Sequence, residues 1–184
     1  IDCDCLGMSG GWTPAVHLFT QSGGKLKFRD DDQVFIPDKY PSDQISIGSC
    51  NGEFTLDEIL SGISKKLKDF LNIKKTEYEN LEIQSHFNKT KRNIWLLPSD
   101  KIIGKTKPFV DYQNDATAKD IKLALREGFR SIEHVKRYTT TGMGTDQGKL
   151  GNMHALGIIS ETAGSKMGEL GTTTFRPVSY THLR

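Results

Sequence analysis

The order of apolar and charged residues near the start of the chain predicts a β-hairpin. Leu26 and Phe28 alternate with basic residues over 25–29, and a second apolar run follows over 34–37. Side chains two apart on a strand point to the same face, so this alternation is typical of a half-buried strand. We interpret the acid triplet over 30–32 as the exposed tip of the hairpin, because no second cluster of metal ligands lies near it in the sequence.

Three further apolar runs predict short strands, over 1–8, 45–48 and 94–98. The first runs into a glycine turn over 9–14, which ends with proline. Residues 15–21 that follow have room for a single helical turn or an irregular segment.

Capping signals and apolar stripes predict one helix in the first half of the chain and three in the second. Thr55 begins a capping box, in which its hydroxyl and a carboxylate three residues later satisfy the first N–H groups of a helix. Apolar residues spaced for one helical face follow it: Leu56, Ile59, Leu60 and Ile63. Thr117 begins a second capping box, whose helix ends at Gly128. Two more helices are expected, one after Ser131 and one over 149–163.

Composition narrows the possible classes of protein. Of the 184 residues, 35% are hydrophobic and 26% are charged, which suits the packed core of one ordinary domain or two small ones. The formal net charge is only +2, which gives no basic stripe of the kind that nucleic acid requires, and no apolar run is long enough to cross a bilayer. Three cysteines are an odd and sparse set that favours a reducing compartment, so we predict a cytoplasmic protein.

The cysteines and large aromatic residues of the first half are most simply structural. Cys3 and Cys5 share one face of the first expected strand, so we predict that they are buried as small hydrophobes rather than metal ligands. Trp12 and Trp95 are interpreted as core or interface anchors. No histidine has a nucleophile or carboxylate spaced for a triad, so no catalytic residue is predicted.

The turn before the first capped helix is a candidate binding site. Residues 49–52 lie between an expected strand and the helix that follows Thr55. Backbone N–H groups and the positive end of the helix dipole meet at such a turn, where dinucleotide cofactors place a phosphate or a ribose. Any strand–helix turn has this pattern, so the turn alone does not identify a ligand.

Two stretches of the chain together resemble one known family. They are CLGMSGGWTPAVHL over 5–18 and the segment 109–154, which begins FVDYQND and continues through TAKDIKLALREGFRSIEHVKRYTTTGMGTDQGK. Both resemble the alpha subunit of bacterial heterotetrameric sarcosine oxidase. The resemblance implies an α/β plus α fold: the C-terminal part of a thioredoxin-reductase-like dinucleotide-binding domain, then a small helical module resembling a [2Fe-2S]-binding domain without its cysteines.

The resemblance also implies the domain boundaries. Residues 1–64 are expected to end an FAD/NAD(P)-binding-like domain, 65–107 to form a linker with one strand, and 108–170 to form the helical module. Residues 171–178 are expected to begin an aminomethyltransferase-like domain, and 179–184 to be a non-native tail. The chain is therefore expected to be an internal fragment that is inactive alone.

In that family the subunit binds NAD, so the resemblance assigns part of an NAD site to the turn before the capped helix. The candidate contacts are Cys50, Asn51, Gly52 and Leu56.

A second cofactor is implied for the helical module. In related amine and proline dehydrogenases four cysteines hold an iron–sulfur cluster, and the resemblance places these positions at Asp111, Gln113, Asp146 and Gly151. Iron–sulfur clusters need thiolates, so no metal cluster is expected here. In the sarcosine oxidase branch the module instead borders FMN at the interface with the beta subunit.

The candidate FMN contacts carry basic, hydroxyl and backbone groups that suit a phosphate. They are Lys136, Arg137, Thr139, Thr140, Thr141 and Gly142. The alternative is that ordinary salt bridges hold the module together and that the threonines satisfy the loop backbone.

The resemblance implies a complex of alpha, beta, gamma and delta subunits that oxidatively demethylates sarcosine to glycine, with hydrogen peroxide and 5,10-methylenetetrahydrofolate as products. FAD is expected on the beta subunit and tetrahydrofolate in a domain outside this chain. One alternative is an alpha-type subunit of another flavin amine or amino-acid dehydrogenase, although those relatives usually keep the cluster cysteines. The other alternative is a non-catalytic assembly module.

Overall fold

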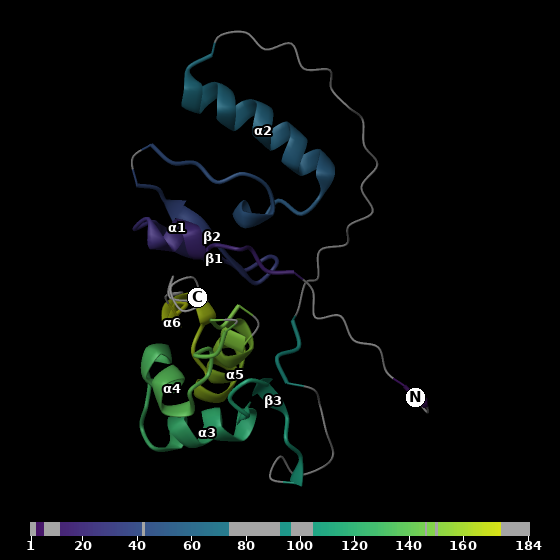
Figure 1. Ribbon diagram of the computed structural model, residues 1–184, viewed down its shortest axis with the longest axis vertical. Helices are drawn as coiled ribbons and strands as arrows, with labels where there is room; N and C mark the ends of the chain where they lie inside the picture. Colours follow the sequence, from purple (N-terminus) through teal and green to yellow (C-terminus); the bar gives the residue numbers. More distant parts are fainter. Residues whose placement is uncertain are drawn as a thin grey trace.

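A computed structural model of the protein describes residues 3–5, 12–41, 43–73, 93–96, 105–145, 147–149 and 151–173 (Figure 1). In chain order the elements are α1 (His17–Gln21), β1 (Lys25–Arg29), β2 (Val34–Lys39), the 3-10 helix η1 (Gly48–Asn51), α2 (Leu56–Leu71), β3 (Phe109–Asp111), β4 (Ala116–Thr117), α3 (Ala118–Arg126), α4 (Ile132–Thr139), α5 (Gly151–Ala163) and α6 (Met167–Leu170). Figure 1 shows α1, α2 and the β1–β2 hairpin in the upper part of the molecule and α3 to α6 in the lower part.

The predicted hairpin is confirmed. β1 and β2 pair in antiparallel register, with Phe28 opposite Phe35 and Arg29 opposite Val34. The acid triplet lies in the turn between the strands, as expected, with Asp30 and Asp31 exposed. Asp32 departs from the prediction, because its side chain is only 8% exposed and pairs with Arg29. The rings of Phe28 and Phe35 pack with their centroids 5.1 Å apart, so one face of the hairpin carries an apolar pair.

Both predicted capping boxes are confirmed. The backbone N–H of Glu58 donates to Thr55 Oγ1 over 3.3 Å, and the Glu58 carboxylate accepts from the Thr55 N–H over 3.4 Å. In α3 the Asp120 carboxylate accepts from the Thr117 N–H over 2.9 Å. α2 continues without a break to Leu71, so the boundary expected between residues 64 and 65 lies inside a helix.

The other helices follow their sequence signals closely. The single turn expected over 15–21 is α1. The chain leaves α3 through Gly128, whose positive φ of 99° few other residues adopt without strain, and α4 begins directly after Ser131. α5 begins at Gly151, two residues later than expected.

One hydrophobic core joins the two parts of the molecule. Its most deeply buried side chains come from α3, α4 and α5: Ile121, Val135, Leu156, Ile158 and Ile159. Phe35 of β2 belongs to the same cluster, and Leu26 and Phe28 of β1 pack against it. Burying a side chain of this size stabilises the fold by about 1.5–3 kcal/mol. The hairpin is therefore held to the helical module by shared apolar burial.

The strand predicted over 45–48 is wrong. Residues 45–47 have no regular structure, and η1 begins at Gly48. Gly48 has φ of 79°, which is incompatible with an extended strand, and its N–H donates to the Glu53 carboxylate over 2.9 Å. This local hydrogen bond turns the chain where the apolar pattern suggested that it would continue straight.

The strand predicted over 94–98 is also wrong for the part that the structure describes, since residues 93–96 are irregular and 97–98 lie outside the described residues. Trp95 explains the apolar run. Its indole packs directly against the backbone of Gly157 in α5, where a Cβ atom would collide with the ring. It also meets His154 edge-on, with ring centroids 6.1 Å apart. The predicted anchoring role of Trp95 is thus confirmed, without a strand.

The start of the chain departs from the prediction as well. Cys3 and Cys5 are exposed, and residues 3–5 form no strand; residues 1–2 and 6–11 lie outside the described residues. Trp12 is 75% exposed. Residues 3–5 lie away from the hairpin and the helices in Figure 1, so no element described there covers these side chains. An apolar run becomes a buried strand only when a neighbour pairs with it.

α2 carries the predicted apolar face, but no residue of this helix is buried. Leu56 is 54% exposed, and Phe70 and Leu71 near the other end are exposed as well. Within the described part of the chain, no helix is both long and apolar enough to cross a membrane.

We expect Phe35→Ala to loosen both halves of the molecule, because Phe35 contributes to the core that joins them. Such a truncation costs about 3–5 kcal/mol, which corresponds to amide exchange roughly a hundredfold faster or more in the segments that depend on it. Hydrogen exchange followed by mass spectrometry should show this increase in α3 and α5 as well as in β1. Lys39→Ala, at the exposed end of the same strand, is the control. Faster exchange confined to the hairpin would show that the two parts do not share a core.

Candidate functional site

Gly52, one of the candidate NAD contacts, is buried and held between two side chains. It has φ of 76°, and a Cβ atom placed on it would lie 2.7 Å from Arg29 Nη2 and 2.9 Å from Ile36 Cγ2. Arg29 Nη2 donates to the Gly52 carbonyl oxygen over 2.9 Å. Arg29 also donates through Nε and Nη2 to the two oxygens of the Asp32 carboxylate. The hydrogen bond to Asp32 raises the pKa of Arg29. Only glycine fits this position.

Asn51, the second candidate, has both ends of its amide engaged. Its oxygen accepts from the Tyr40 hydroxyl over 3.2 Å, and its nitrogen donates to Glu53 over 2.9 Å. Glu53 also accepts from Lys66 Nζ over 2.5 Å and from the Gly48 N–H over 2.9 Å. Burial tends to raise the pKa of Glu53, but the hydrogen bonds from Lys66, Gly48 and Asn51 outweigh it, so the pKa lies below its ordinary value. The turn is thus organised around an ionised carboxylate.

The remaining candidates of this turn present different groups. The Cys50 thiol donates to the Ile47 carbonyl oxygen over 3.2 Å, whereas Leu56 is exposed. At the start of α2 the Glu58 carboxylate accepts from the N–H groups of Phe54 and Thr55. With Glu53 and Glu58 both nearby, the turn is better suited to the hydroxyl groups of a ribose than to a phosphate, because carboxylates accept hydrogen bonds and repel anions.

Asp111 is the centre of the second candidate site. The residue is 5% exposed. Its carboxylate accepts hydrogen bonds from the N–H groups of Gln113 (2.9 Å), Asn114 (3.2 Å) and Gly142 (2.6 Å), and from the Asn114 amide (3.3 Å). Burial alone would raise the pKa of Asp111. The hydrogen bonds, led by that from Gly142, lower the pKa by more than burial raises it, so it lies below its ordinary value. An ionised side chain on β3 therefore fixes the loop that follows α4.

The structure brings together three of the four positions at which the resemblance places cluster ligands in relatives. Gln113 donates to the Thr145 hydroxyl, next to Asp146. A Cβ atom on Gly151 would lie 3.8 Å from Asp111 Cβ, so β3 and the start of α5 touch there. The side chain of Asp146, the fourth position, lies outside the described residues.

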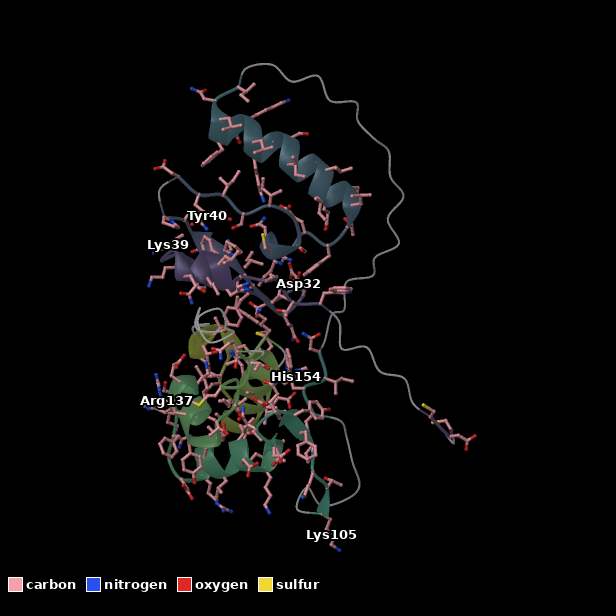
Figure 2. The ribbon with its side chains drawn as sticks, in the orientation of Figure 1. Asp32, Lys39, Tyr40, Lys105, Arg137 and His154 are labelled. Atoms are coloured by element: carbon pink, nitrogen blue, oxygen red, sulfur yellow. The ribbon has the colours of Figure 1, made fainter. Side chains whose placement is uncertain are left out.

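The six candidate FMN contacts divide into two groups. Thr139, Thr141 and Gly142 are buried, and their polar atoms are used inside the loop: the two hydroxyls share a hydrogen bond of 2.7 Å. Arg137 and Thr140 are exposed and Lys136 is half-buried. Arg137 lies at the outer edge of the helical module in Figure 2 and pairs with Glu133 over 3.4 Å. The two cations also lie in the last turn of α4, where they offset the negative end of its dipole.

Sequence reasoning found the turns but missed the side chains that hold them. Arg29 and Glu53 were not singled out, and Asp111 was noted only as a position that lacks cysteine. No local signal marks them, because Arg29 lies 23 residues from Gly52 and Asp111 lies 31 residues from Gly142. A buried charge beside a left-handed glycine becomes visible only once the chain is folded.

We expect Gly52→Ala to destabilise the turn by about 3 kcal/mol, the sum of a strained backbone and overpacking against Arg29 and Ile36. Gly23→Ala is the matched control, since Gly23 has φ of 92° but open space around its Cβ position, and it should cost only about 1 kcal/mol. Proteolysis rates in increasing urea would compare the two variants. Equal losses would mean that the contacts with Arg29 and Ile36 contribute nothing.

We expect Asp111→Asn to weaken the loop over 139–142 by about 2 kcal/mol, because Asn cannot replace charge-assisted bonds to every donor. The folded pKa of Asp111 is depressed, so wild type should keep its full advantage above the unfolded pKa of about 3.9 and lose it as the pH falls through the folded pKa. Amide exchange of the loop, compared between variant and wild type at each pH, measures this difference. Asp115→Asn, at an exposed position nearby, is the control; a difference that persists unchanged at low pH would argue against the ionised carboxylate.

Comparison with solved structures shows a shared fold. L-proline dehydrogenase from P. horikoshii matches 90% of this chain and 35% of its own chain, with a TM-score of 0.58 and 21% sequence identity.

Comparison of sequences identifies the family. Residues 105–182 match the family model described as the sarcosine oxidase A3 domain. The chain is 35% identical over 96% of its length to sarcosine oxidase subunit alpha of Rhizobium meliloti (strain 1021), and 33% identical over 99% to that of Corynebacterium sp. (strain P-1). It spans 18% and 20% of these two relatives. The predicted resemblance is thereby confirmed: the chain belongs to the family of sarcosine oxidase alpha subunits.

Proposed function

We propose that this chain is part of the alpha subunit of a heterotetrameric sarcosine oxidase. The complex oxidises the N-methyl group of sarcosine, reduces oxygen to hydrogen peroxide, and transfers the one-carbon unit to tetrahydrofolate, leaving glycine. The observation that carries the proposal is the Asp111 network. Asp111 and Gln113 stand at two of the positions to which the resemblance assigns the cluster-binding cysteines of dehydrogenase relatives, and hydrogen bonds hold both side chains there.

Within this proposal, the chain joins two functional parts. Residues up to the end of α2 form the last portion of a thioredoxin-reductase-like dinucleotide-binding domain. Residues from β3 to α6 form the module that resembles a [2Fe-2S]-binding domain. The fold shared with L-proline dehydrogenase over 90% of the chain supports the presence of these two parts side by side in one chain, because a match of that length extends over most of both. The shared core fixes their relative position.

The helical module would form one wall of an FMN site at the interface with the beta subunit. Lys136, Arg137 and Thr140 fit the FMN phosphate, since they offer two cations and a hydroxyl at one end of α4. Thr139, Thr141 and Gly142 instead hold the loop that presents Thr140. When bound, FMN supplies the transfer of electrons to oxygen. The residues of this chain would bind and position the cofactor, and none of them is assigned as a catalytic acid or base.

The turn around Gly52 would contribute part of an NAD site. Its ionised Glu53, held by Lys66, suits a ribose hydroxyl, and the exposed Leu56 offers an apolar surface beside it. Cys50, Asn51 and Gly52 shape the turn through internal contacts. FAD would lie on the beta subunit and tetrahydrofolate in another domain of the alpha subunit, with gamma and delta subunits completing the complex.

A dehydrogenase of another amine or amino acid is the second candidate function. The fold shared with L-proline dehydrogenase favours it. An assembly module without a cofactor is the third, and the exposed apolar residues of α2 favour that reading. The dehydrogenase would differ from the oxidase in its electron acceptor, and the assembly module would differ from it in containing no flavin.

The test is a peroxide assay on the full-length protein produced with its partner subunits. We expect sarcosine to yield hydrogen peroxide, and added tetrahydrofolate to replace free formaldehyde by methylenetetrahydrofolate. A flavin-loaded complex that reduces an artificial dye with sarcosine but forms no peroxide would favour the dehydrogenase. A folded complex without flavin would favour the assembly module.

One variant ties the assay to this chain. Arg137→Met should lower the FMN content of the purified complex severalfold, because it removes a cation from the proposed phosphate site. It should cost the fold little, since the exposed pair with Glu133 contributes only about 0.3–0.5 kcal/mol. Arg130→Met, an exposed arginine before α4, is the matched control. Equal FMN content in both variants would show that Arg137 does not contribute to FMN binding.

A further inference from the structure

A cavity lies between the segment that precedes α1 and the start of α5, and none of the candidate NAD or FMN contacts lines it. Its volume is about 170 Å³. Val16, Phe35 and Met153 form an apolar wall, and Val16 and Phe35 are themselves buried. Four separate stretches of the chain, 13–17, Phe35, 149–153 and Thr172, therefore border a space that the side chains of the described residues do not fill.

The polar side chains of the cavity can all donate hydrogen bonds. His17 and Lys149 line it with an imidazole and an ammonium group, Thr13 and Thr172 with hydroxyls, and none of the described residues that line it is acidic. Burial lowers the pKa of His17, and the charge of Lys149, which lines the same cavity, lowers it further. At neutral pH a neutral imidazole and one ammonium leave a single positive charge. Such a lining favours an anion with one negative charge.

The size of the cavity limits the ligand. An engineered apolar cavity of about 150 Å³ in another protein takes one benzene molecule. A six-membered ring or a compact aliphatic group therefore fills this space, and a nucleotide does not. A carboxylate carries one charge at neutral pH, whereas a phosphate group carries about 1.5 to 2. The single charge and the apolar wall together select a carboxylate with a small apolar body.

We propose that this cavity binds a small monocarboxylate. The carboxylate accepts charge-assisted hydrogen bonds from Lys149 and a hydrogen bond from His17, and the apolar body lies against Phe35 and Met153. The site is separate from the proposed NAD and FMN contacts, none of which lines it. A ligand there would bridge the segment before α1 and the helical module.

The experiment is isothermal titration calorimetry at pH 7.5 with benzoate as the probe, on the full-length protein with its partner subunits. We expect saturable binding in wild type and affinity about tenfold weaker, or binding lost, in Lys149→Met, because the charged partner of the carboxylate is removed. Lys119→Met, an exposed lysine on α3, should bind as wild type does. Comparing these variants separates this cavity from carboxylate sites elsewhere in the protein.

Two further measurements complete the test. Lys149→Gln should repeat the loss while keeping a polar side chain, which guards against a folding defect peculiar to the Met variant. Inorganic phosphate, titrated in the same way, should bind more weakly than benzoate. Absence of benzoate binding, or an unchanged affinity in either Lys149 variant that folds, would overturn the proposal; tighter binding of phosphate would overturn the assignment to carboxylates.

Discussion

The Asp111 carboxylate organises the half of the molecule that carries the candidate FMN wall. An ionised group taken out of water is costly unless hydrogen bonds replace its hydration. Each oxygen of Asp111 accepts two such bonds, and their donors come from its own turn and from the loop after α4. The charge therefore ties β3 to Gly142 across 31 residues of sequence, and the loop inherits its shape from that bond.

In the other half of the molecule a cation, Arg29, connects distant segments as the Asp111 anion does. Arg29, at the end of β1, binds the Asp32 carboxylate and the Gly52 carbonyl oxygen, so the hairpin tip and the turn before α2 share one guanidinium. A planar donor fork suits this double role, which an ammonium could not fill with the same geometry. Because Phe35, on the neighbouring strand, enters the core of the helical module, the position of this turn also depends on the apolar core.

The elements that the sequence predicted well are those whose signals are local. The capping boxes at Thr55 and Thr117 and the alternation around Phe28 each lie within a few residues, so they determine structure with little help from elsewhere. The strands expected over 45–48 and 94–98 are wrong, because an apolar run specifies burial and not the type of element that becomes buried. Trp95, for example, packs without a strand against the backbone of Gly157, where the missing side chain leaves room for its ring. The turn over 49–52 was found from its place between an expected strand and a helix, and the candidate FMN loop through resemblance. Two of the charges that hold them, Arg29 and Asp111, come from distant segments.

An iron–sulfur cluster crosslinks the segments that supply its ligands, and the Asp111 network connects two of the same segments by hydrogen bonds. In relatives with four cysteines, the metal would tie the β3 segment to the loop before α5. Here the bond from Gly142 to Asp111 and the bond between Gln113 and Thr145 connect the same two segments. Hydrogen bonds of this kind are individually weaker than metal–thiolate bonds, and the bond between Gln113 and Thr145 is exposed. Asp111, however, is buried and its carboxylate is fully hydrogen-bonded, which makes its surroundings rigid. On the proposed relationship to a cluster-binding module, these bonds would let the module keep its shape without the metal, provided that the carboxylate stays ionised.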